Sequence, residues 1–261
     1  MKLAIRSFLV AMLAVFSLTS CLASSSGEAK ALKELQRMNA SDYFESQAQI
    51  DLVRAAERGN AGEISGAIDQ GADVNKVGKQ GMTPLFWALA KQNLEGFRLL
   101  LEHGANPHVV VELPEGFQAS HAGAVEMASK LEDSRYLRAL LEHGADPNMI
   151  VNEESRQTPI YLAIMHRRLD NIKVLLEFEA NLDHQDATLH TPLMRALSAR
   201  MFENALFLLR AGSDPTIPNR WGNNAADMVR QYGDRGIDKR TNDLAAYKEF
   251  VKELKERGLL E

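Results

Sequence analysis

One motif recurs along this chain of 261 residues, and it limits what the chain can fold into. A Thr-Pro pair is followed, 21 residues after the Thr, by a short turn triplet such as Gly-Ala-Asn. A Thr hydroxyl can accept a hydrogen bond from a free N–H group at a helix start, and Pro at the first helical position has no N–H to leave unpaired. Gly after an apolar run can take the left-handed conformation that ends a helix. Each copy therefore predicts a structural unit rather than an active site. In the three copies, the Thr and the first residue of the triplet are Thr83 and Gly104, Thr158 and Glu179, and Thr191 and Gly212.

The turn triplets repeat along most of the chain. Their first residues are 33, 40, 35 and 33 positions apart, and two amphipathic helical patterns precede each triplet. A period of this length with small insertions is typical of stacked repeats. The triplets occupy residues 71–73, 104–106, 144–146, 179–181 and 212–214.

The combined pattern resembles the ankyrin repeat over residues 50–257. It consists of Thr-Pro-Leu at a helix start, an Ala five positions after the Thr (Ala88, Ala163, Ala196), a Leu-Leu pair and a terminal Gly-Ala-Asp. The resemblance implies an all-α fold, an ankyrin-repeat solenoid of about six helix-turn-helix units with projecting hairpin loops, in which neighbours bury each other's apolar faces. The predicted units lie near residues 50–78, 79–111, 119–151, 154–186, 187–219 and 220–257.

Some positions depart from the family pattern. The third unit has Gly123 in place of the Thr, so its helix start is expected to be less sharply defined. Apolar contact is expected to replace the His that usually follows Thr-Pro-Leu, at Phe86, Tyr161 and Met194. The family usually has Gly at the end of the inner helix, and this chain has other residues there. We expect each of them either to take the left-handed conformation, at a cost of about 1 kcal/mol, or to extend the inner helix. These positions are Gln92, Glu132, Arg167 and Arg200.

The predicted closing helix covers residues 243–257 and has one apolar side, as an end cap requires. Its expected buried residues are Leu244, Tyr247, Phe250, Val251 and Leu254.

Residues 1–20 have the pattern of a secretory signal peptide. Lys2 and Arg6 form a basic start, and the apolar run at residues 8–18 is short for a membrane span. The sequence Leu-Thr-Ser-Cys that ends at Cys21 resembles the bacterial lipobox, which implies that Cys21 is lipidated. The alternative is an ordinary signal peptide that is cut near residues 23–24.

Leu22 follows the Cys where lipoproteins of the inner membrane often carry Asp, so the resemblance favours the outer membrane, facing the periplasm. A Gram-positive cell surface stays open as an alternative. Residues 21–28 are expected to be a lipidated tether and residues 29–49 an N-terminal helical extension. Residues 29–38 could instead continue the tether.

Composition and motifs argue against nucleic-acid binding and catalysis. The formal charge is −5 and no concentrated Lys/Arg patch is evident, so no nucleic-acid partner is expected. Cys21 is the only Cys, and no metalloprotease, hydrolase or nucleotide-binding motif occurs, so no enzyme activity, metal or cofactor is expected. His103 and His143 precede helix-ending glycines and are interpreted as structural. His108 and His121 flank the long loop at 109–120 without an evident third ligand.

Protein binding is the remaining expectation. The resemblance implies that hairpin tips and the exposed ends of the inner helices bind another protein. The expanded loop 109–120 has two possible roles: it presents Leu113 or Phe117 to a partner, or it folds back on the third unit. Trp87 and Trp221 are expected to be core or stacking residues. The candidates carried over by register, with the two loop residues, are Glu57, Arg58, Ala90, Lys91, Leu113, Phe117, Lys130, Leu131, Met165, His166, Ser198, Ala199, Gln231 and Tyr232.

The sequence thus predicts a non-enzymatic protein-binding module in the bacterial cell envelope. We expect a monomer that touches the membrane only through its lipid anchor and binds another, periplasmic protein of unknown identity. Two finer roles stay open: an immunity protein or inhibitor that neutralises a periplasm-acting toxin or hydrolase, and a scaffold or chaperone for a periplasmic enzyme.

Overall fold

The structure is a computed structural model that describes residues 39–112, 121–232 and 243–261. The chain divides into two compact units, Met1–Ala145 and Asp146–Glu261, which are described separately. The predicted signal peptide, tether and Cys21 lie outside the described residues, as do residues 29–38, Leu113 and Phe117. In the described residues no helix is long and apolar enough to span a membrane.

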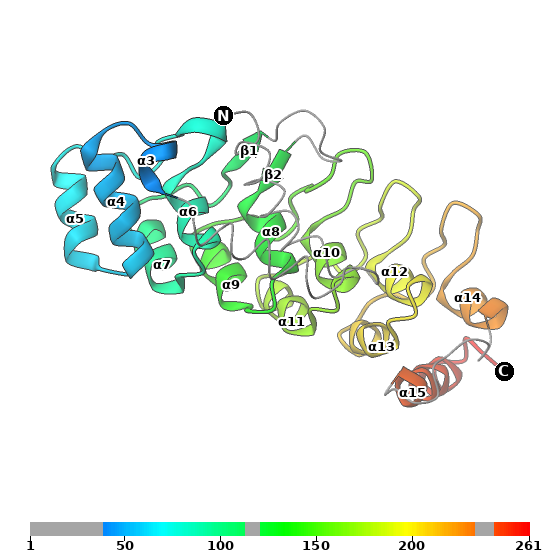
Figure 1. The fold of residues 1–261 in the computed structure, drawn as a ribbon. Helices are drawn as coiled ribbons and strands as arrows, with labels where there is room; N and C mark the ends of the chain where they lie inside the picture. The colour runs from blue at the N-terminus through cyan, green and yellow to red at the C-terminus, as the bar shows by residue number, and fades with distance from the viewer. Residues whose placement is uncertain (1–38, 113–120, 233–242) are drawn as a thin grey trace, which may run out of the picture. The chain divides into compact units, whose positions relative to one another are not determined.

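The first unit consists of paired helices joined by short turns (Figure 1). Helices α4 and α5, α6 and α7, and α8 and α9 form the pairs, and α4 packs on both α6 and α7. The elements are α3 (Ala40–Tyr43), α4 (Gln47–Arg58), α5 (Ala61–Asp69), η1 (Lys79–Gly81), α6 (Pro84–Ala90), α7 (Leu94–Glu102), α8 (Ala124–Lys130) and α9 (Arg135–Glu142), with the antiparallel strands β1 (Val110–Glu112) and β2 (His121–Gly123).

The second unit repeats the helix pairs (Figure 1). Long loops project from the helices before α12 and before α14. Phe202 and Tyr247 meet edge to face at 5.0 Å, and Phe250 and Leu254 are fully buried, so the closing helix packs through its apolar side. Of the five residues predicted to be buried, Leu244 and Val251 are only half-buried. The helices are α10 (Pro159–Met165), α11 (Leu169–Glu177), α12 (Pro192–Ser198), α13 (Phe202–Arg210), α14 (Ala225–Tyr232) and α15 (Asp243–Glu256).

The Thr-Pro pairs mark helix starts as predicted. Thr83 and Thr191 accept hydrogen bonds from backbone N–H groups three residues on, at 3.2 and 3.3 Å. Thr158 also precedes a helix but makes no such cap bond. At Gly123, where Thr is absent, the Glu126 carboxylate accepts a bond from the Gly123 N–H at 3.4 Å, which gives the helix start a defined partner.

Three of the four non-Gly residues at the ends of inner helices adopt the first of the two predicted alternatives, the left-handed conformation. Gln92, Arg167 and Arg200 take the left-handed conformation, with φ of 56°, 57° and 56°. The longer-helix alternative is therefore wrong at these positions. Before Glu132 the chain instead leaves α8 through an extended Leu131, with φ of −68° and ψ of 153°.

A ladder of side-chain bonds links successive repeats. Asn75 donates to the Gly104 carbonyl at 3.0 Å and accepts from the Asn106 N–H at 2.7 Å. Asn148 bonds to Glu179 and Asn181 in the same way, at 3.3 and 2.7 Å. The other ladder positions are His108, whose Nε2 lies 3.1 Å from the Gly144 carbonyl, and Asp183, which accepts from the Asp214 N–H at 2.9 Å.

Candidate protein-binding surface

Three hairpin tips share a five-residue geometry, at residues 78–82, 186–190 and 219–223. In each tip the first N–H donates to the carbonyl of the fifth residue, at 2.7, 3.0 and 2.9 Å respectively. The fourth residue is left-handed in all three, with φ of 72° at Gly81, 59° at Leu189 and 79° at Gly222. This conformation suits Gly because it has no Cβ, so Leu189 is the exception.

A polar network joins the residues on either side of Leu189, Thr188 and His190, to Asp186. The side chain of Asp186 is fully buried, and its carboxylate accepts from the Arg195 guanidinium at 2.5 Å and from the Thr188 hydroxyl at 2.7 Å. Arg195 also donates to the Thr188 oxygen at 2.9 Å. Burial alone raises the pKa of the Asp186 carboxyl, but the bonds from Thr188 and Arg195 outweigh burial and hold it below its ordinary value. The tip is therefore built around an ionised carboxylate.

His190 completes this network as a neutral imidazole. Its Nδ1 lies 2.7 Å from the Thr188 oxygen, whose proton goes to Asp186, so Nδ1 carries the hydrogen and donates. Its Nε2 faces the Asn219 amide nitrogen at 3.5 Å and acts as the acceptor. Burial lowers the pKa of His190, and Arg195 lowers it further. A proton on Nε2 would point at the Asn219 N–H group, so this contact disfavours the protonated imidazole, in agreement with the lowered pKa of His190.

Tyr161 anchors the same loop from helix α10. Its hydroxyl lies 2.6 Å from the His184 carbonyl and 2.8 Å from the His190 carbonyl. Burial raises the pKa of Tyr161, so the phenol stays a donor. The expectation of purely apolar contact is thus wrong for Tyr161, because its hydroxyl supplies hydrogen bonds. Phe86 and Met194 at the equivalent positions are buried.

The tip at 219–223 displays an exposed tryptophan. Trp221 is 64% exposed, and its ring meets His190 edge to face at 5.7 Å. The Arg220 guanidinium lies 5.7 Å from the centre of the same ring. Of the two predicted alternatives for Trp221, core or stacking residue, the ring contact agrees with stacking, and the exposure excludes the core. Trp87, in contrast, is fully buried between Tyr43 and Phe44, as predicted.

In the first unit, two predicted partner-facing residues are not accessible. Ala90 is only 5% exposed, and the Lys91 side chain is also 5% exposed because it lies 4.9 Å above the Trp87 ring and 3.4 Å from Glu57. These two assignments are wrong. Arg58 is exposed and pairs with Glu63.

The remaining first-unit candidates lie at the end of α8. Lys130 pairs with Glu126 at 2.6 Å, and its side chain is 15% exposed. Leu131 is half-buried at the helix end. Neither offers a large surface.

The candidates of the second unit lie mostly at exposed helix ends. Met165 is 48% exposed, His166 is half-buried, and Ser198, Ala199 and Gln231 are exposed. The side chain of Tyr232 lies outside the described residues. Sequence reasoning missed Leu189 and Arg220. Leu189 could have been found by aligning it with Gly81 and Gly222, since among these three tips Gly is replaced at the fourth position only here.

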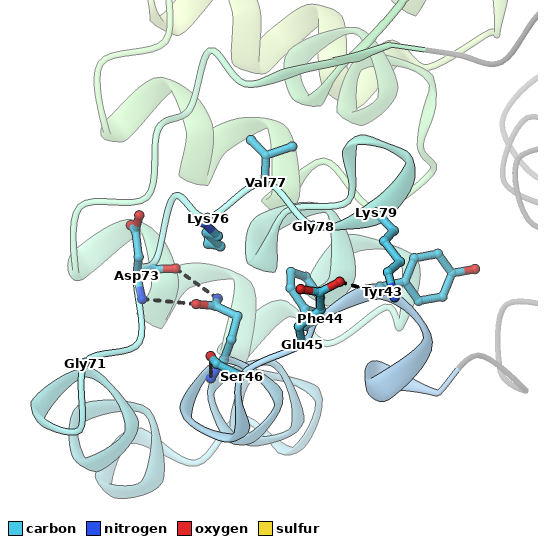
Figure 2. A pocket seen from close by; sticks show the side chains of 11 residues that line it. Tyr43, Phe44, Glu45, Ser46, Gly71, Asp73, Lys76, Val77, Gly78 and Lys79 are labelled. Atoms are coloured by element: carbon cyan, nitrogen blue, oxygen red, sulfur yellow. Dashed lines mark hydrogen bonds and ion pairs between the residues drawn. The ribbon is translucent and has the colours of Figure 1, made fainter.

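A cavity of about 680 Å³ in the first unit lies between the start of α4 and residues 71–79 (Figure 2). The Gln49 amide bonds both the N–H and the carbonyl of Asp73, at 3.1 and 2.9 Å, and holds one wall. Glu45 and Lys79 face each other at 3.6 Å on the opposite side. The lining carries both charge signs, which gives no preference for one class of ligand.

Metal binding finds no support in the described residues. They contain no group of three His, Cys, Asp or Glu side chains that could hold an ion. His108 instead occupies a ladder position opposite Gly144. His143 bonds the Ala139 carbonyl through Nδ1 at 2.8 Å at the end of α9, as its structural interpretation predicted.

Paired helices with short turns, bonded loops and projecting tips define a repeat-built helical protein. The family described as ankyrin repeats (3 copies) matches residues 20–110 and 125–219. The chain therefore belongs to the ankyrin repeat family, and the predicted all-α ankyrin-repeat fold is confirmed. The only strands in residues 39–112, 121–232 and 243–261 are the short pair β1 and β2. This family is typically a non-enzymatic scaffold for protein interactions.

Individual relatives agree with this assignment. The chain is 26% identical over 143 residues to a putative ankyrin repeat protein of fowlpox virus (strain NVSL), covering 54% of this chain and 17% of the relative. It is 34% identical over 64 residues to the human DNA-binding protein RFXANK, covering 24% and 25%. The chain thus spans a quarter or less of these curated relatives.

Two crystal structures show the same fold. The ankyrin repeat protein EF0377 aligns with a TM-score of 0.60 at 22% identity, over 79% of this chain and 96% of that one. The ankyrin repeat domain of Bcl-3 aligns with a TM-score of 0.61 at 21% identity, over 77% and 85%.

Proposed function

We propose that this chain is a non-enzymatic protein-binding module that binds its partner through the hairpin tips at 186–190 and 219–223. One observation carries the proposal: exposed Leu189 and Trp221 stand on a buried network of hydrogen bonds that holds both tips. A rigid surface with exposed apolar side chains binds without a large ordering penalty. Ankyrin repeats mediate protein–protein interactions, which agrees with this role.

The test compares binding by tip variants with binding by the unmodified chain. The full chain is used to capture proteins from envelope extract, beside Leu189→Gly with Trp221→Ala. Val77→Ser is the control, since Val77 is 60% exposed in the other unit. We expect the double variant to lose the captured partner and the control to retain it. Equal recovery with all three baits would contradict the proposed surface.

We further propose that the module is held in the bacterial cell envelope, on the periplasmic face of the outer membrane, by a lipid on Cys21. The support is in the sequence: the basic start, the apolar run and the Leu-Thr-Ser-Cys sequence that ends at Cys21. Several acyl chains on one residue would give persistent anchoring. Mass spectrometry should show an acylated wild type and no acylation in Cys21→Ser. A soluble, unacylated wild type would contradict the anchor.

A tethered binding module of this kind fits two roles. As an immunity protein or inhibitor it would block a periplasm-acting toxin or hydrolase, and as a scaffold or chaperone it would stabilise a periplasmic enzyme. Once a partner is captured, its activity with and without the chain separates the roles. Inhibition supports the first role, and longer activity on heating supports the second.

Whether the loop at 109–120 contacts a partner or folds back on the third unit stays open. Exchanging it for a short turn and repeating the capture tests whether Leu113 and Phe117 take part. Unchanged recovery would remove them from the binding surface.

A further inference from the structure

We propose that Leu189, Arg220 and Trp221 form a docking surface for an acidic protein segment that carries an apolar side chain. A carboxylate of the partner would pair with the Arg220 guanidinium, and the apolar side chain would pack on Trp221 and Leu189. This inference rests on the proposed protein-binding function and specifies the chemistry of the partner.

The three residues belong to one surface because their tips are bonded to each other. The Arg220 N–H donates to the Thr188 carbonyl at 3.3 Å. The Trp221 ring meets His190 at 5.7 Å. Leu189 stands between Thr188 and His190 in the chain, so it lies next to both contacts.

The surface is fixed before a partner arrives. The Asn219 side-chain oxygen accepts from the N–H groups of Trp221 and Asn223, at 3.0 and 3.1 Å. On the neighbouring tip, Gln185 donates to the carbonyls of Leu189 and Pro218, at 2.9 and 3.0 Å. Binding then requires little further ordering of the backbone, which favours affinity.

The charge of Arg220 indicates the sign of the partner. Lys79 has the same position in the tip at 78–82, where Glu45 lies 3.6 Å away. Within the described residues, Arg220 has no carboxylate at ion-pair distance, and its guanidinium lies over Trp221. A guanidinium stacked on an aromatic ring still has N–H groups that can bind a carboxylate in a bidentate manner. The available cation therefore fits a carboxylate supplied by another chain.

The apolar part of the surface sets the second requirement. Trp221 is 64% and Leu189 is 42% exposed. Leu189 keeps an exposed apolar side chain in a left-handed conformation that costs about 1 kcal/mol, whereas Gly occupies this position in the other two tips. Trp and Arg are also the side chains most often found at the energetic centres of protein interfaces. An apolar side chain beside the carboxylate matches this arrangement.

The experiment uses the full chain, purified in detergent, to select from a phage-displayed library of random linear peptides. Selected peptides are synthesised, and their affinities are measured for the wild type, Arg220→Glu, Trp221→Ala and Leu189→Gly. Lys79→Glu is the matched control because it makes the same charge change at the same position of another tip. Circular dichroism checks that each variant is folded.

We expect the selected peptides to share an Asp or Glu beside an apolar residue. Arg220→Glu and Trp221→Ala should each weaken binding about tenfold or more, whereas Lys79→Glu should leave it unchanged. Replacing the acidic residue of the peptide by Lys should restore binding to Arg220→Glu. Rescue by this charge exchange would show direct pairing.

Two results would overturn the proposal in distinguishable ways. Peptides that bind the chain but do not respond to the three tip variants would leave protein binding intact and remove this docking surface. A chain that selects no peptide and captures no protein would contradict both this inference and the proposed function.

Discussion

Gly96 packs directly against Ala56, so closely that a Cβ on Gly96 would lie 1.8 Å from the Ala56 carbonyl oxygen. The contact brings helix α7 against helix α4. Gly96→Ala should therefore force the helices apart and lower the free energy of unfolding by about 3 kcal/mol. Urea denaturation measures this loss. Gly66→Ala is the control, since a Cβ there meets nothing within 4 Å, and its helical position predicts a gain of up to about 1 kcal/mol. Equal effects of the two changes would contradict the close contact.

The second prediction concerns the buried carboxylate of Asp186. Asp186→Asn removes the charge that Arg195 and Thr188 bond, and should destabilise the protein by about 3 kcal/mol. Asp170→Asn should change stability by less than about 1 kcal/mol, because its pair with Lys173 is largely exposed. Thermal unfolding of both variants provides the comparison. A mild effect of Asp186→Asn would show that the tip does not depend on this carboxylate.

The third prediction is a loss of stability in mild acid that originates at His190. The pKa of His190 is lowered in the folded chain, so below about pH 6.5 the unfolded chain binds a proton that the folded chain resists. The free energy of unfolding should fall as the pH decreases below about 6.5. At higher pH, where His190 is neutral in both the folded and the unfolded chain, this loss of stability should vanish. Urea midpoints across this range should depend less on pH in His190→Gln. An NMR titration that places His190 above its ordinary pKa would contradict the prediction.

The fourth prediction tests the left-handed position in two tips. Leu189→Gly removes the left-handed strain, about 1 kcal/mol, while increasing the freedom of the unfolded chain, so the net change in stability should be small. Gly222→Ala introduces the strain without a clash, because a Cβ there meets nothing within 4 Å, and should cost about 1 kcal/mol. Thermal unfolding distinguishes the two. A large loss in Leu189→Gly would mean that Leu189 serves stability rather than binding.

Helix starts and ends were predictable from the sequence because they depend on local chemistry. A Thr hydroxyl and the ring of Pro act on the next few residues, and the bond from Phe86 to Thr83 spans only three positions. The left-handed residues also follow from spacing, since Arg167 and Arg200 stand where the family pattern has Gly.

The binding surface was less predictable because its bonds join distant positions. The Tyr161 hydroxyl reaches a carbonyl 29 residues later, which no local pattern encodes. Register assigned Ala90 and Lys91 to the exposed end of an inner helix, but the Trp87 ring and Glu57 cover Lys91. Periodicity identifies the side of a helix that faces the core. It does not tell which side chains from neighbouring positions cover the other side of the helix.

The ladder bonds have a consequence for how the repeat array can grow. In each of the links from Asn75, Asn148 and Asp183, the side chain belongs to the earlier repeat and the bonded backbone to the later one. A repeat duplicated in the gene would carry its own ladder side chain, and the following copy would present the backbone N–H group that this side chain binds. Such an array can lengthen by recombination without new residues evolving at the junction.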